Sequence, residues 1–161
     1  MNGTQHIVMA SGVSAALLTG YGEQALIPAV GIIAGALLPD IDTPDSTIGS
    51  VFPMTSRLCN DIFGHRRLLH SVWSAAPFIA SGIYFDIPVL LSIGIGIILH
   101  LLLDCFTTTG IRPVFPIRGR ISMYRGKTSG VLGWSMTIGL QAALYYVSTE
   151  TGILGMIFRM M

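Results

Sequence analysis

Several histidines and aspartates in the sequence have the types and spacings of metal ligands. His100 and Asp104 are four residues apart, so in a helix both lie on one face and can point at the same ion. Asp40 and Asp42 adjoin Pro39 at the end of an apolar run, and two carboxylates at such a place repel each other unless a cation neutralises them. The full set of candidate ligands is His6, Asp40, Asp42, His65, His70, His100 and Asp104.

Each of these groups also has a purely structural explanation. A histidine in a membrane helix can form a hydrogen bond with an aspartate one turn away, and the pair then clamps two helices together. The aspartates of the stretch DIDTPDS (residues 40–46) can cap a helix. His65 and His70 are five residues apart, so they do not share one narrow face of an ideal helix, and alone they are weak evidence.

The composition indicates a membrane protein. Hydrophobic residues make up 52% of the chain and charged residues only 11%, whereas about a quarter of the residues of a soluble domain are charged. A helix that crosses the hydrocarbon core needs about 20 mostly apolar residues, and the sequence contains several such runs. The first run has no basic leading region, so we interpret it as retained structure and not as a cleaved signal peptide.

The apolar runs predict an all-α fold, a polytopic membrane helix bundle of about five helices in a single domain over residues 1–161. The third run contains Pro77, so its helix is expected to kink or to join the next helix through the turn at residues 86–88. Gly31, Gly35, Gly94 and Gly96 would let helices approach closely, but glycine is common in membrane helices, and we favour this simpler explanation. The predicted helices span about 4–20, 24–39, 71–85, 87–104 and 130–149, with a basic loop over 106–129.

The basic residues predict the orientation of these helices. They fall in the connection between the second and third helices and in the connection between the fourth and fifth, which places both connections in the cytoplasm. The candidate ligands then share one end of the bundle, a polar His/Asp cluster that faces the cytoplasm. Imidazole and carboxylate ligands without thiolates suit zinc, with manganese or iron as alternatives, and seven candidates suffice for one or two ions.

Basic side chains near the cluster are candidates for phosphate binding. Arg66 and Arg67 stand beside His65, and the loop after the fourth helix interleaves its basic residues with glycines. Attraction to anionic lipids would select the same residues without any site. The candidates for substrate binding are Arg66, Arg67, Arg118, Arg120, Arg125 and Lys127. A net charge of only +1 argues against a nucleic-acid partner.

The motifs LPDID, GHRRLLHS and HLLLDCFTTTG, with PVFP following and a histidine near the N-terminus, resemble those of the YdjM-type inner-membrane proteins. The resemblance covers His6 to about Pro116 and implies that the seven candidate ligands are the polar signature of the family. It also implies a LexA-regulated, membrane-bound, metal-dependent hydrolase of the bacterial inner membrane. The family pattern is closer to HRGxTHS, and here Arg67 and Leu69 replace the glycine and the threonine. The pattern is similar as well to helical zinc-dependent phospholipases C and single-strand nucleases, an analogy only.

The function expected from these features is hydrolysis of a phosphoester, with a membrane lipid as the expected substrate. A metal-activated water would attack, Asp42 or Asp104 would be the general base, and Arg66 or Arg67 would hold the leaving phosphate. Two alternatives remain open, a non-catalytic membrane protein with a structural metal site and a small transporter. The sequence does not indicate whether the protein is an oligomer.

Overall fold

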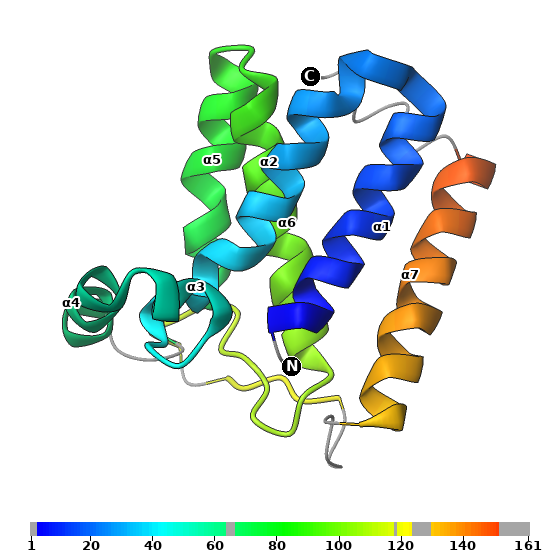
Figure 1. Ribbon diagram of the computed structural model, residues 1–161. Coiled ribbons are helices and arrows are strands. Elements are labelled where there is room, and N and C mark those ends of the chain that lie inside the picture. The colour runs from blue at the N-terminus through cyan, green and yellow to red at the C-terminus, as the bar shows by residue number, and fades with distance from the viewer. Residues whose placement is uncertain (1–2, 64–66, 118, 124–129, 152–161) are drawn as a thin grey trace.

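The computed structural model describes residues 3–63, 67–117, 119–123 and 130–151, and this part of the chain is built from helices (Figure 1). The one β-type pairing in these ranges is an isolated antiparallel bridge between Ile111 and Ile121. The elements are α1 (Gly3–Tyr21), the 3-10 helix η1 (Gly22–Ala25), α2 (Leu26–Leu37), the 3-10 helix η2 (Leu38–Asp42), α3 (Thr47–Val51), α4 (Pro53–Phe63), α5 (Val72–Tyr84), α6 (Pro88–Cys105) and α7 (Val131–Thr151).

The longer helices α1, α2, α5, α6 and α7 form an up-and-down bundle, and the short helices α3 and α4 lie at one end of it (Figure 1). Helix α6 is central, since it packs against α1, α2 and α5. Helix α7 packs against α1, where Gly12 faces the side chain of Gln141. The helical bundle expected from the sequence is therefore confirmed, including the five longer helices.

Among the residues that the structure describes, two segments are long and apolar enough to cross a membrane, Gly3–Asp42 and Pro88–Cys105, and the apolar helix Val72–Tyr84 is shorter. The first segment folds back on itself at η1, so that α1 and α2 run side by side in opposite directions (Figure 1). A polar contact joins the two arms, because the Ser14 hydroxyl donates a hydrogen bond of 2.9 Å to the carbonyl of Ala29. Pro77 lies inside α5, and α5 and α6 are separate helices joined at Asp86, which has a φ of 54°.

Glycines bring the backbones of α2 and α6 into direct contact. A Cβ atom added to Gly35 would collide with the backbone of Ile93, and one added to Gly96 would collide with the carbonyl of Ile32. Gly31 has the same relation to Ser92. Our simpler explanation of these glycines by composition was therefore wrong, because close approach of α2 and α6 requires a residue without a side chain at these positions.

Helices α3 and α4 occupy a stretch that we expected to be a connecting loop. Ser46 caps the N-terminus of α3, with its Oγ accepting a hydrogen bond of 2.9 Å from the amide of Gly49. Helix α4 begins at Pro53, a residue suited to the first helical position. The other helices were predicted from apolar runs of about 20 residues, and α3 and α4 are too short to contain such a run. They were therefore not predicted.

We predict that replacing Gly35 with alanine destabilises the protein by about 1–3 kcal/mol, the usual cost of overpacking a core. The added methyl group must push α2 away from the backbone of α6. Thermal unfolding of the detergent-solubilised protein measures the effect. The control is Gly20→Ala in α1, where a Cβ would meet nothing within 4 Å. Equal stability of the two variants would show that the α2–α6 contact is not tight.

Candidate metal centre

Six of the predicted ligands come together at the end of the bundle that also carries α3 and α4. His6 lies in the first turns of α1, His100 and Asp104 in the last turns of α6, and His70 just before α5. All are buried, with His70, His100 and Asp104 at 0% exposure. We call this group the His/Asp cluster, and its members are His6, Asp40, Asp42, His70, His100 and Asp104.

The tight turn η2 places Asp40 and Asp42 in the cluster. In this 3-10 helix the chain carries both residues into the protein, with Asp42 at 0% exposure. The carbonyl of Asp40 accepts hydrogen bonds from the amide of Thr43 at 3.0 Å and from the hydroxyl of Ser46 at 2.7 Å. These bonds hold the turn, so the Asp40 and Asp42 carboxylates are presented by a fixed backbone.

Four side-chain atoms converge at the centre of the cluster. The Nε2 atoms of His70 and His100 are 3.4 Å apart. Asp40 Oδ1 lies 3.6 Å from His70 Nε2 and 3.8 Å from His100 Nε2. Asp104 Oδ2 lies 3.8 Å from each of these two nitrogens. A tetrahedral zinc site with bonds of about 2.0–2.2 Å has ligand atoms about 3.3–3.6 Å apart, so the separations among Asp40, His70 and His100 fit one ion with little adjustment.

The far ring nitrogen of each histidine lies beside an oxygen atom, in a hydrogen bond for His100 and at ion-pair distance for His70. His100 Nδ1 lies 2.7 Å from the carbonyl oxygen of Ala36. A carbonyl only accepts, so the proton is on Nδ1 and the lone pair of Nε2 points at the centre. On His70, Nδ1 lies 3.4 Å from Asp42 Oδ2. Such carboxylate and carbonyl partners are typical of metal-binding histidines.

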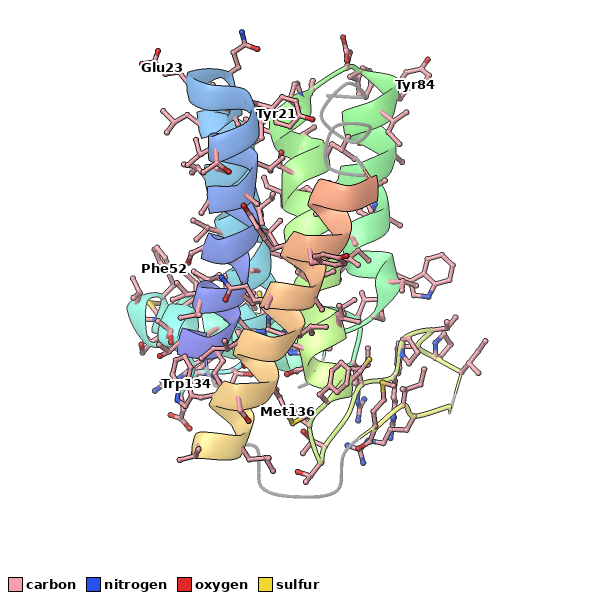
Figure 2. All side chains as sticks on the ribbon, turned by 90° about the vertical axis from the view of Figure 1, so that its right-hand side faces the viewer. Tyr21, Glu23, Phe52, Tyr84, Trp134 and Met136 are labelled. Atoms are coloured by element: carbon pink, nitrogen blue, oxygen red, sulfur yellow. The ribbon has the colours of Figure 1, made fainter. Side chains whose placement is uncertain are left out.

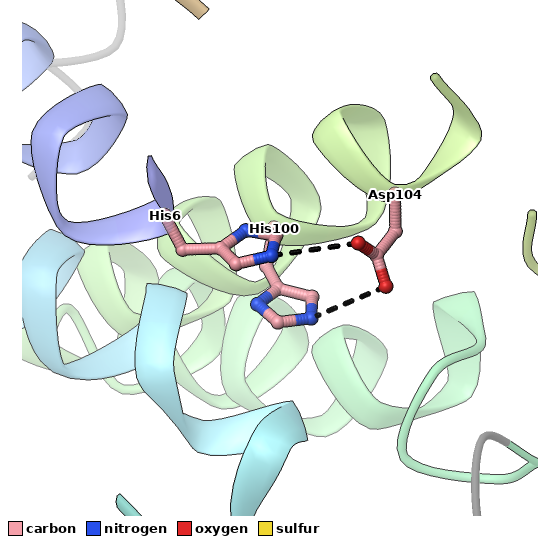
Figure 3. A group of neighbouring side chains, drawn as sticks. All are labelled: His6, His100 and Asp104. Carbon is pink, nitrogen blue, oxygen red and sulfur yellow. Dashed lines mark ion pairs between the residues drawn. The ribbon is translucent and has the colours of Figure 1, made fainter. Parts of the chain in front are cut away.

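His6 reaches the cluster from α1, and it and His100 both face the carboxylate of Asp104 (Figure 3). Its ring stacks on that of His100, with the centroids 3.8 Å apart and an interplanar angle of 14°. Its Nε2 lies 3.4 Å from Asp104 Oδ1. Its Nδ1 is buried without a hydrogen-bond partner among the described residues.

Two overlapping groups of three side chains could hold an ion, one made of His6, His100 and Asp104 and the other of Asp40, His70 and His100. A bound metal lies close to the plane of each imidazole, along the nitrogen lone pair. Stacked, nearly parallel rings such as His6 and His100 do not direct their lone pairs to one point. His70 and His100 meet at 71°, so their planes cross, and the geometry favours the second group.

The carboxylates around His70 make the cluster attractive to cations. Burial alone would lower the pKa of His70, but the nearby carboxylates of Asp40 and Asp42 outweigh it and raise this pKa to about 9. Without metal, His70 therefore carries a proton at neutral pH and takes the place of a cation among the aspartates. A divalent ion must displace this proton.

The remaining predicted site residues are not part of the cluster as described. Arg67 and Arg120 are exposed. His65, Arg66, Arg118, Arg125 and Lys127 lie outside the described residues. The carbonyl of Ala36, which lies beside His100 Nδ1, was not predicted. A backbone acceptor leaves no signal in the sequence.

We predict that His70→Ala and His100→Ala each abolish stoichiometric metal binding, because each removes a central nitrogen. Asp42→Asn should instead leave the stoichiometry unchanged and weaken the affinity about 10–100-fold, the usual effect of losing a partner of a ligand. Elemental mass spectrometry and competition titration of the purified protein measure both quantities. Asp45→Asn, at an exposed position of the same loop, is the control. A wild-type protein that stays metal-free after incubation with zinc and with manganese would contradict the assignment.

We also predict that the apparent metal affinity rises with pH up to about 9, the pKa of His70 in the metal-free protein. Below this pH each ion bound releases the His70 proton, so the affinity should change about tenfold per pH unit. If the pKa of His70 were that of an unperturbed histidine, the affinity would stop rising at about pH 6.5. Competition titrations across this range separate the two cases, and a plateau from neutral pH upward would show that His70 is not protonated in the metal-free cluster.

Comparison with known proteins places the chain in a family. The model of the family described as YdjM inner membrane protein matches residues 1–161. The chain is 36% identical over 152 residues to "Uncharacterized protein YvsG" of Bacillus subtilis (strain 168), which covers 91% of this chain and 93% of that relative. It is 30% identical over 99 residues to "Inner membrane protein YdjM" of Escherichia coli (strain K12), which covers 56% of this chain and 50% of that relative. No solved structure matches the chain significantly. Because the family model spans its whole length, the chain belongs to the YdjM family of inner membrane proteins.

Proposed function

We propose that the protein is a membrane-bound, metal-dependent hydrolase that acts on a phosphoester, with a membrane lipid as substrate. The observation that carries the proposal is the convergence of His70 Nε2, His100 Nε2 and Asp40 Oδ1, with an Asp104 carboxylate beside them. Three protein ligands with a further position for water are the usual arrangement of a catalytic zinc site. Zinc is the first candidate and manganese or iron the alternatives, since the ligands are imidazoles and carboxylates.

Asp40, His70 and His100 would hold the ion in this proposal. When bound, a divalent cation lowers the pKa of water toward neutrality and stabilises negative charge on phosphoryl oxygens. Asp42 fixes the orientation of His70 through Nδ1, and the carbonyl of Ala36 does the same for His100. The two candidate groups of ligands share His100, and the single lone pair on its Nε2 can bind only one ion. We therefore propose one ion in the cluster.

Asp104 is the better of the two candidate general bases. Its Oδ2 lies 3.8 Å from both His70 Nε2 and His100 Nε2, beside the place where a water would be activated. Its Oδ1 lies 3.4 Å from His6 Nε2, so a proton on this nitrogen would orient the carboxylate. Asp42 faces the opposite nitrogen of His70 and is a positioning residue in this scheme.

The basic residues singled out in the sequence are proposed to bind the phosphate. Arg67 is exposed and precedes His70 by three residues, so a substrate approaching the cluster at this end would meet it early. Arg66, Arg118, Arg120, Arg125 and Lys127 belong to the same proposal. A guanidinium binds phosphate oxygens in pairs, which would hold the leaving phosphate of the ester.

An apolar groove favours a lipid over a water-soluble ester. Its volume is about 290 Å³, and it lies between α6 and α7. Phe106, one of its residues, comes two positions after Asp104, so the groove adjoins the α6 end of the cluster. A groove of this kind can take an acyl chain while the headgroup lies at the cluster. Its lining is Leu103, Phe106, Met136, Gly139 and Leu140.

A structural metal site is the second candidate function. The complete burial of His70, His100 and Asp104 favours it, because a catalytic site must admit both water and substrate. In that case Asp104 would be the fourth ligand and the coordination would be saturated.

We predict metal-dependent release of headgroup or phosphate from long-chain phospholipid by protein in liposomes. Chelation should abolish the release, and zinc or manganese should restore it. Asp104→Asn should retain metal and lose about 100-fold or more in rate, as expected for a general base. Stoichiometric metal without turnover, together with unfolding on chelation, would favour the structural site, and a wild type that binds no metal would refute both.

Gly139→Leu, assayed on the same preparations, tests whether the substrate is a lipid whose acyl chain lies in the groove. A Cβ at Gly139 meets nothing within 4 Å, so a leucine there fills the groove without disturbing the bundle. Turnover of long-chain lipid should fall, while turnover of a water-soluble aryl phosphodiester and the metal content should not change. An equal loss on both substrates would argue against acyl-chain binding in this groove.

A further inference from the structure

Helix α4 has three distinct faces. Ser56 is fully buried and Cys59 half-buried on the side that packs against the protein. Met54, Leu58 and Ile62 recur every four residues, so they form one stripe, and they are 85%, 59% and 64% exposed. We call these three residues the α4 stripe.

The charged residues of α4 lie beside the stripe and not on it. At 100° per residue, Arg57 and Asp61 fall on one edge of the stripe, and both are exposed. The outer surface of the helix is thus divided between an apolar half and a charged half. The exposed face of a surface helix in water is typically polar, whereas a helix at a membrane surface has an apolar and a charged half.

The apolar surface continues into the end of α3. Val51 is 64% exposed and Phe52 is 51% exposed. In Figure 2, Phe52 lies on the side of the short helices that is turned toward the middle of the bundle. Phe52 is therefore directed along the bundle, the direction in which the apolar helices extend.

Two further features place the membrane boundary at this end of the bundle. Helix α6 has 18 residues, about 27 Å at 1.5 Å per residue, which is close to the roughly 30 Å of the hydrocarbon core. Asp104 lies in its last turn, so that turn marks one boundary. Trp73, at the start of α5, is 52% exposed and donates a hydrogen bond of 2.8 Å from its indole to the carbonyl of Phe115. Half-exposed tryptophans are typical of the interface.

From these observations we propose that α4 lies in the plane of the membrane at the boundary between headgroups and acyl chains. The occupant of the α4 stripe is the lipid bilayer, and Arg57 and Asp61 face the headgroup layer. Because α4 packs against η2, the helix holds the turn that carries Asp40 and Asp42 at a constant depth. The proposal does not depend on whether the cluster hydrolyses anything.

Site-directed spin labelling of the full-length protein in liposomes tests this placement. Cys59 and Cys105, both free thiols, are replaced by serine, and metal content and monodispersity verify this background. Single cysteines are then introduced at the stripe positions, Met54, Leu58 and Ile62, and at the matched charged positions, Arg57 and Asp61. Collision rates with oxygen, which is concentrated in acyl chains, and with a water-soluble nickel chelate are measured at each.

We expect labels on the α4 stripe to collide preferentially with oxygen and to lose chelate collisions relative to labels at Arg57 and Asp61. All five labels colliding mainly with the chelate would place α4 in water and overturn the proposal. Stripe labels protected from both reagents would overturn it in favour of a protein partner, and spin–spin broadening between labelled copies would identify a second copy of the chain. As a second measurement, hydrogen exchange of the unlabelled wild type should show α4 better protected in liposomes than after solubilisation, and equal exchange would contradict the proposal.

Discussion

The backbone contact between α2 and α6 is the constraint on which the site depends. Gly35 and Gly96 allow the two helices to touch without intervening side chains, and this proximity brings the carbonyl of Ala36 within 2.7 Å of His100 Nδ1. That bond selects the tautomer of His100 and turns Nε2 to the cluster. The same approach carries η2, which directly follows α2, over the end of α6. Helix packing and ligand geometry therefore have one physical origin.

The composition of the cluster follows from its burial. Charged groups in a low-dielectric interior are costly unless they neutralise one another. The cluster combines three aspartates with three histidines, and its short ion-pair distances show mutual compensation without metal. A proton on His70 or a divalent ion can serve as the positive partner of Asp40 and Asp42. The protein can thus exist with and without metal while the cluster stays electrostatically balanced.

The sequence allowed prediction of the helices because membrane spans are recognised by length and hydropathy alone, and of the cluster because ionisable residues are rare in such spans. It did not allow separation of ligands from their supporting residues. Asp40 and Asp42 look equivalent in the sequence. In the structure, however, the Asp40 carboxylate lies beside Nε2 of His70, and the Asp42 carboxylate lies beside Nδ1 on the opposite side of that ring. Only the path of η2 distinguishes them. Helix α4 was not predicted for a different reason, since its apolar residues recur every four positions with polar residues between them and therefore form no continuous run.

The favoured ligands lie far apart along the chain, at Asp40, His70 and His100, on η2, before α5 and on α6. No two of these three ligands are close enough in the sequence to chelate an ion within one short stretch. Folding must therefore close the loops between them before they can meet. During biosynthesis the emerging chain therefore has no complete coordination sphere until α6 has entered the bundle. Metal binding by these three residues would therefore be a late event in assembly, and an ion held by them could not be the nucleus around which the earlier helices first gather.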